Sequence, residues 1–202
     1  MKRETKLNVC LFVLLVAIGA AGRWLGARDE WGLLSPNFTP MAAIGLFAGY
    51  LFANRWLALA VPVAAMALSN LYLASYHSWL MPAAVVASFM TAPLLGRIVR
   101  SRPNVWRTAL VVVAPAAFFF VTTNFVHWFD DGYRLHAMYG RGWGGLMACY
   151  AAGLPFFRWM LEGDVVFAAV LFGSYVLANR AVAVSSPLVG VHASACRPQA
   201  KA

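Results

Sequence analysis

Residues 106–127 read WRTALVVVAPAAFFFVTTNFVH, and this stretch decides the fold class. Its one Lys, Arg, Asp or Glu is Arg107, near the start. A transmembrane helix needs about 20 mostly apolar residues, and this stretch satisfies that length. The rest of the 202-residue chain has the same character, with 62% hydrophobic and 11% charged residues, whereas a soluble domain has about 25% charged residues. We therefore expect residues 1–202 to form one all-α domain, a polytopic membrane helix bundle.

Working outward from this stretch, the apolar pattern predicts about six transmembrane helices. Their expected ranges are 8–26, 38–53, 56–74, 80–98, 106–127 and 163–183. The second range is short, because a helix of this length reaches only about 24 Å and the hydrocarbon core is roughly 30 Å thick. It could cross a locally thinned bilayer or form a re-entrant hairpin. Residues 185–202 are expected to be a flexible cytoplasmic tail.

Residues 143–161 are apolar but make a poor spanning helix, because they contain Gly153, Pro155 and Arg158. We predict a separate interfacial or partly inserted helix here, whose aromatic side chains suit the headgroup region. Glu162 and Asp164 would then stand at the start of the last helix. Acidic side chains at that position stabilise the helix dipole.

The basic residues predict the orientation, because Lys and Arg are enriched in cytoplasmic loops. The chain has 16 Lys and Arg against 7 Asp and Glu, a formal net charge of +9. With six crossings and a cytoplasmic N-terminus, most of the 16 fall on the cytoplasmic side, and the exceptions are Arg23, Arg28, Arg134, Arg141 and Arg158. We expect an inner-membrane protein with both termini in the cytoplasm.

Several function classes lack their sequence signals. The basic residues form no stripe with interleaved aromatic residues, so no nucleic-acid partner is expected. Cys10, Cys149 and Cys196 match no metal-ligand spacing. The chain contains no glycine-rich phosphate loop and no metalloprotease or nucleophile-elbow motif. We expect no metal, no cofactor and no enzymatic activity, and any active transport would need a separate motor subunit.

Polar side chains gather near the predicted outer ends of three helices. Asn124, His127 and Trp128 are three and four residues apart and would share a helix face. Polar groups within a membrane tend to face the bundle interior or a cavity. We therefore predict an external substrate pocket lined by Asn37, Thr39, Asn70, Asn124, His127 and Trp128.

Each of these residues also has a structural interpretation. Asn37 and Thr39 could cap the second helix, Asn70 could join two helices by a hydrogen bond, and Trp128 could anchor the membrane interface. A catalytic alternative uses His127 with Asp130 or Asp131 as acid and base, but no nucleophile or metal set accompanies them.

The first predicted helix carries small residues four apart. Ala17 and Ala21 form one such pair, and Gly22 and Gly26 form another. Small residues at this spacing let a second helix approach closely. The partner could be a helix of this chain or a helix of another subunit.

Three motifs carry a family resemblance: residues 37–43 (NFTPMAA), residues 123–128 (TNFVHW), and residues 154–157 (LPFF) with the following 162–164 (EGD). Over roughly residues 8–180 the chain resembles a family of uncharacterised bacterial membrane proteins. More distantly, its layout resembles the S components of energy-coupling-factor transporters. Those are six-helix proteins that capture vitamins or metal ions and work with a transmembrane coupling subunit and two ATPases.

This second resemblance implies a role for the first helix, because S components use an Ala-x-x-x-Ala surface there to meet the coupling subunit. Ala17 and Ala21 match that pattern. The leading hypothesis is therefore a substrate-binding subunit that captures a small organic solute from the outer face. The alternative is a non-catalytic structural subunit of a larger membrane complex.

Overall fold

The computed structural model describes residues 2–27, 37–73, 76, 78–101, 105–132 and 138–185. These residues form six α-helices and no β-strand, which confirms the all-α fold class for the described part of the chain. The helices are α1 (Lys2–Ala27), α2 (Met41–Leu51), α3 (Arg55–Asn70), α4 (Leu80–Ser101), α5 (Val105–Asp131) and α6 (Trp143–Ser185). Of the expected tail 185–202, residues 186–202 lie outside the described residues.

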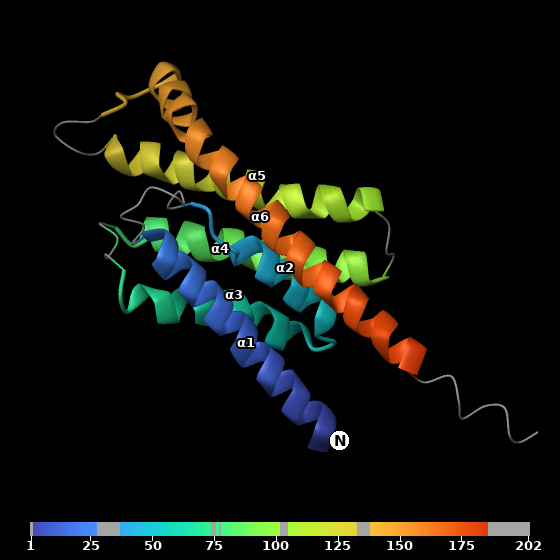
Figure 1. Ribbon diagram of the computed structural model, residues 1–202. Helices are drawn as coiled ribbons and strands as arrows, with labels where there is room; N and C mark the ends of the chain where they lie inside the picture. The colour runs from blue at the N-terminus through green and yellow to red at the C-terminus, as the bar shows by residue number, and fades with distance from the viewer. Residues whose placement is uncertain are drawn as a thin grey trace, which may run out of the picture.

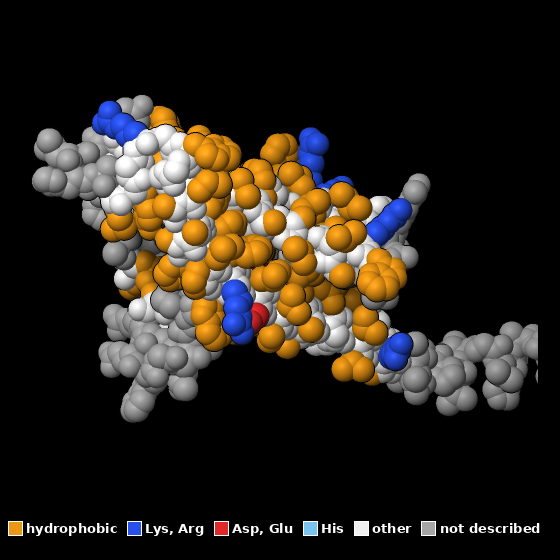
Figure 2. Space-filling model, turned by 90° about the horizontal axis from the view of Figure 1, so that it is seen from above, with side chains coloured by type: hydrophobic (Ala, Val, Ile, Leu, Met, Phe, Trp, Pro, Cys, Tyr) orange, Lys and Arg blue, Asp and Glu red, His pale blue; other side chains and the backbone are white. Residues whose placement is uncertain are grey.

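Four of the described helices are long and apolar enough to cross a membrane. They contain the ranges Glu4–Ala27, Leu80–Ser101, Ala109–Asp131 and Trp143–Ala181. Hydrophobic side chains cover much of the outer surface, as Figure 2 shows for one face. These helices are therefore compatible with a membrane protein. Because α2 and α3 are shorter, the count of six crossings stays a prediction.

The long helices form a layered bundle. In Figure 1, α3, α4 and α5 run side by side, and α1 and α6 cross them obliquely. The start of α1 and the end of α6 lie at the same end of the bundle, together with the α2–α3 connection, the end of α4 and the start of α5 (Figure 1). Each helix thus runs back along its predecessor.

The short helix α2 is the centre of this bundle. It contacts every other described helix, and residues 41–49 are all buried. Eleven residues give a helix of only about 16 Å, so the predicted helix over 38–53 was too long. Pro40 stands at its start and Phe52 is already extended. A helix this short is tolerated at membrane depth because surrounding protein, and not lipid, covers its polar ends.

Small residues let α4 pack directly onto α2. A Cβ atom added to Gly49 would overlap the backbone carbonyl of Pro93, and one added to Gly96 would overlap the carbonyl of Leu46. At Gly45 the added atom would lie 3.0 Å from Cβ of Ala92. The two backbones are therefore in contact, as in the small-residue interfaces of other membrane helices.

The structure corrects the predicted division between an interfacial helix at 143–161 and a span at 163–183. Both belong to α6, a single helix of 43 residues. Its first part runs in a different direction from the rest (Figure 1), and Pro155 lies within it. Proline removes one helical hydrogen bond and commonly bends the helix without ending it.

Packing against α5 explains why α6 continues through this region. The phenol of Tyr150 donates a hydrogen bond to the carbonyl of Val121 at 2.9 Å, and the ring centroids of Phe157 and Phe120 lie 4.9 Å apart. The charge of Arg158 is paired within the helix. These contacts with α5 therefore stabilise α6 although its glycine, proline and arginine residues disfavour a membrane helix.

Candidate functional site

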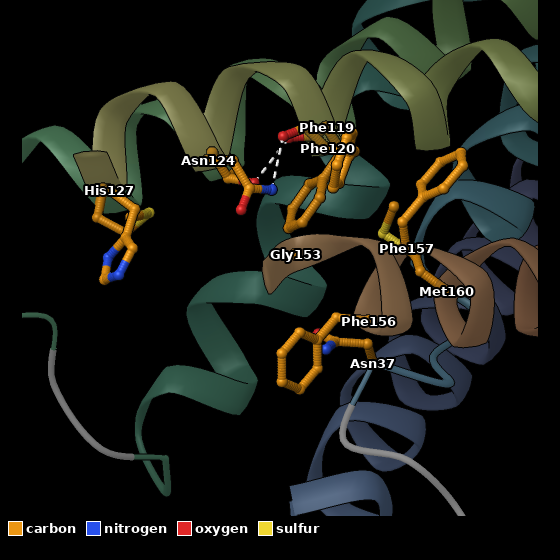
Figure 3. A pocket seen from close by; sticks show the side chains of 11 residues that line it. Asn37, Phe119, Phe120, Asn124, His127, Gly153, Phe156, Phe157 and Met160 are labelled. Atoms are coloured by element: carbon orange, nitrogen blue, oxygen red, sulfur yellow. Dashed lines mark hydrogen bonds between the residues drawn. The ribbon is translucent and has the colours of Figure 1, made fainter. Parts of the chain in front are cut away.

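A cavity of about 400 Å³ lies between α5 and the first half of α6 (Figure 3). Helix α4 contributes Met81, and the segment before α2 contributes Asn37. The lining residues are Asn37, Met81, Phe119, Phe120, Thr123, Asn124, His127, Gly153, Phe156, Phe157 and Met160. None of these described residues carries a Lys, Arg, Asp or Glu side chain.

The polar groups of the cavity come mainly from the last turns of α5. Asn124 donates from Nδ2 to the carbonyl of Phe120 at 2.8 Å, and Thr123 donates from Oγ1 to the carbonyl of Phe119 at 2.7 Å. Both side chains therefore bond back to their own helix. No described residue donates to Oδ1 of Asn124, so this amide oxygen can accept a hydrogen bond from a bound molecule.

The absence of a side chain at Gly153 leaves space for the side-chain amide of Asn124. A Cβ atom at position 153 would overlap Oδ1 of Asn124 and would lie 2.9 Å from the ring of Phe120. Nearby, the thiol of Cys149 contacts the backbone carbonyl of Asn124 at 3.4 Å. Glycine at this position thus lets α6 pass close to α5 while the amide stays in the cavity wall.

Aromatic rings form the apolar walls. Phe120 contacts Phe157 with ring centroids 4.9 Å apart and Tyr150 at 5.6 Å, and Phe119 contacts Phe89 of α4 at 5.0 Å. The imidazole of His127 stands edge-on to the ring of Tyr139, at 5.9 Å. A few polar atoms on an apolar wall are the usual composition of a small-molecule site.

The structure brings together three of the six predicted pocket residues, Asn37, Asn124 and His127. Thr39 does not line the cavity: its N–H donates to the carbonyl of Asn37 at 3.0 Å, and it packs against Gly163 of α6. The indole of Trp128 turns away and donates to the carbonyl of Gly140 at 3.2 Å.

Asn70 lies in a second polar cluster, between α1 and α3. Its Oδ1 accepts a hydrogen bond from Nη1 of Arg23 at 3.0 Å, and the same guanidinium donates to Ser69 and to Tyr76. These contacts are the interhelical hydrogen bonds of the structural interpretation. His77, adjacent to this cluster in the sequence, lies outside the described residues.

The cavity residues on α6 were not anticipated. Gly153, Phe156, Phe157 and Met160 have the spacing of one helix face. Apart from Arg158 and Glu162, the residues on the opposite face are apolar as well, so hydropathy alone did not single out the side that faces the cavity.

The two small-residue pairs of α1 differ in burial, because the glycine pair faces the bundle and the alanine pair is exposed. A Cβ atom at Gly22 would overlap the ring of Pro40, so the partner of Gly22 is internal, and Gly26 is buried. Ala17 and Ala21 are exposed. They line an apolar groove of about 510 Å³ with Leu68 of α3 and with Tyr72, which follows that helix.

Asp164 is buried in the middle of the bundle, with 1% of its surface exposed. Its Oδ1 accepts a hydrogen bond from the backbone N–H of Ala43 at 3.3 Å, and no described residue bonds to its buried Oδ2. Pro40, at the N-cap position of α2, offers no side-chain cap. Asp164 therefore caps α2 from another helix. The predicted role at the start of the last helix was wrong, because α6 begins at Trp143.

The acid–base alternative gains no geometric support. Oδ2 of Asp131 accepts a hydrogen bond from the backbone N–H of Tyr139 at 3.1 Å, so this carboxylate bonds to the segment that precedes α6. No described residue forms a hydrogen bond with the imidazole of His127. Among the described residues, no group of three or more His, Cys, Asp or Glu side chains could hold a metal ion.

Comparison with known protein families finds a match over most of the chain. The model of a family of unknown function, DUF6580, matches residues 3–187. No curated protein and no solved structure matches the chain.

Proposed function

Because the chain belongs to the DUF6580 family, whose function is unknown, its role rests on the site, and we propose that it captures a small organic solute in the cavity between α5 and α6. The observation that carries the proposal is the cavity of about 400 Å³ that contains Asn37, Asn124 and His127. Small-molecule pockets range over about 300–1,000 Å³ and are mostly apolar with a few placed polar groups.

The lining indicates what kind of solute would fit. Oδ1 of Asn124 can accept a hydrogen bond, while His127 and Asn37 can both donate and accept. The rings of Phe119, Phe120, Phe156 and Phe157 favour a flat, ring-containing molecule. With no charged side chain among the described lining residues, a charged solute would lack a counter-charge. We therefore expect an uncharged ring compound with hydrogen-bonding groups.

A membrane pocket alone gives no net transport. In the finer form of the proposal, the chain works like an S component of an energy-coupling-factor transporter, with a separate coupling subunit and ATPases. The return of both described ends to one end of the bundle supports this layout (Figure 1). So does the exposure of Ala17 and Ala21 on α1. The proposal places the protein in the inner membrane with both termini cytoplasmic.

The test compares two asparagine variants: Asn124 lines the cavity, whereas Asn70 lies outside it. The wild-type protein is purified from its native membrane in mild detergent, and compounds that remain bound are identified by native mass spectrometry. We expect the wild type and Asn70→Ala to retain a small ring compound, and Asn124→Ala to lose at least about nine-tenths of it, equivalent to roughly 1.4 kcal/mol. Equal retention by Asn124→Ala would remove the cavity from the proposal.

A structural subunit of a larger membrane complex is the second candidate. The favouring observation is the exposed aromatic surface on the first half of α6, where Trp143, Phe156 and Trp159 are each more than a third exposed. Large exposed apolar side chains of this kind suit a protein partner as well as lipid. If the protein is such a structural subunit, it should be recovered within a stable complex that contains no ATPase, and it should carry no bound solute.

A further inference from the structure

Helix α6 carries an ion pair on its outer face. Nε of Arg158 lies 2.8 Å from Oε1 of Glu162, and 76% and 43% of the two side chains are exposed. The two residues are one helical turn apart. The pair therefore faces away from the bundle, although both residues belong to a helix with the composition of a membrane span.

Contacts with α5 place this pair level with the middle of the apolar part of that helix. The ring of Phe157, the neighbour of Arg158, lies against Phe120. Phe120 is the central residue of the apolar range Ala109–Asp131, with eleven residues on either side (109–119 and 121–131). In Figure 2 one basic and one acidic side chain touch on the surface, and hydrophobic side chains lie on both sides of them. The charges are thus far from either end of the span.

Such a position is unfavourable in lipid. Charged residues in membrane helices are rare and almost always face a bundle interior, a water-filled cavity or a charged partner. The residues around the pair have the spacing of a helix–helix contact, three or four apart along the exposed face: Met147, Ala151, Leu154, Arg158, Glu162, Val165 and Ala169. The small side chains of Ala151 and Ala169 would let a second helix approach closely.

We infer that this face of α6 binds α6 of a second copy of the chain within the membrane. The argument is charge complementarity. A two-fold axis along the membrane normal brings two identical faces together, since such an interface is self-complementary. Arg158 of each copy then stands beside Glu162 of the other, offset by about 6 Å along the helix. The long arginine side chain can reach across this offset, as interhelical ion pairs do in parallel coiled coils.

The bonding capacity of both groups fits this arrangement. A guanidinium has five N–H donors and a carboxylate accepts about four hydrogen bonds. The hydrogen bond between Arg158 and Glu162 within the helix uses one donor of the guanidinium and one acceptor site of the carboxylate. In a dimer the remaining groups would form a four-charge cluster that is shielded from lipid. This inference is independent of the proposed solute site, because Arg158 and Glu162 do not line that cavity.

The experiment uses two charge reversals and two affinity tags on the full chain in lipid nanodiscs or mild detergent. We expect differently tagged wild-type copies to purify together. Arg158→Glu should lose self-association by at least tenfold, and so should Glu162→Arg, because each reversal sets like charges against each other. Co-expression of the two variants should restore association, since one copy then carries two acidic and the other two basic side chains.

Controls separate loss of the interface from loss of folding. Arg55→Glu reverses an exposed arginine on α3 and should self-associate like the wild type. The neutral variants Arg158→Gln and Glu162→Gln avoid like-charge repulsion and should give folded protein with weakened association. Monomeric wild-type protein, undiminished self-association of Arg158→Glu, or failure of the mixed reversals to associate would each overturn the inference.

Discussion

Helix α2 and the first half of α6 are both apolar segments with small residues, and the bundle uses them in opposite ways. Residues 41–49 of α2 are all buried, and α4 packs against them backbone to backbone at Gly49 and Gly96. The first half of α6 leaves a cavity of about 400 Å³ on one side and exposes its other side. Apolar composition alone therefore does not separate a packed core from a site with room for a ligand.

The two regions differ in what lies opposite three of their glycines, Gly49, Gly96 and Gly153. At Gly49 on α2 and Gly96 on α4 the nearest atoms are backbone atoms, which cannot move aside. At Gly153 on α6 the nearest atom is the end of a side chain, Oδ1 of Asn124. We expect substitutions in the first region to act on stability and substitutions in the second to act on binding.

The largest effect is expected for Gly96→Ala. The added methyl group would overlap the carbonyl of Leu46, and overpacking of a core typically costs about 1–3 kcal/mol. Because a backbone must shift, we expect a loss near about 3 kcal/mol, measured by denaturant titration in detergent. Gly173→Ala is the matched control, since nothing lies within 4 Å of that position. Equal stability of the two variants would contradict close packing of α2 on α4.

Asp164→Ala should have the next largest effect, because it removes the cap of α2 at Ala43. Lost helix caps cost about 0.5–2 kcal/mol, and we expect a value near the upper limit, since the site is buried. Asp164→Asn keeps an oxygen that can accept from Ala43 and should retain most of the stability. The measurement is the same denaturant titration. If both variants lost equal stability, the cap would not be the reason for the aspartate.

The smallest effect on stability is expected for Gly153→Ala, in the second region. The side chains of Asn124 and Phe120 would both have to shift away from the new methyl group. Because side chains move more readily than a backbone, the unfolding free energy should fall by only about 1 kcal/mol. The shift moves the amide oxygen of Asn124 out of its place in the cavity wall. Retention of the bound compound in native mass spectrometry should fall at least about tenfold. Gly144→Ala, in open surroundings, should leave both properties unchanged.

The sequence identified parts of the candidate site but not its composition. Asn124 and His127, three residues apart on one helix, do line one cavity with Asn37. Asn70 and Trp128 belong to the same kind of polar cluster in the sequence, yet their side chains bond to Arg23 and to Gly140. These partners lie 47 and 12 residues away, and helical spacing says nothing about such distant contacts.

Misjudged segment boundaries had a common cause. Gly153, Pro155 and Arg158 look unfavourable for a helix when residues 143–161 are considered alone. In the structure Gly153 fits the Asn124 side chain and Arg158 pairs with Glu162. Neighbouring groups thus accommodate Gly153 and Arg158, and the helix continues through Pro155.

By itself the sequence determined the class of protein and the approximate positions of its helices. The reason is that lipid offers no hydrogen bonds to the backbone, so long apolar stretches must be helical. Only the tertiary structure decided that α2 is a short central helix, that α6 is continuous, and which polar side chains share a cavity. Side chains that face lipid and side chains that face protein are equally apolar here, so the packing of one helix on another leaves no periodic signal in the sequence.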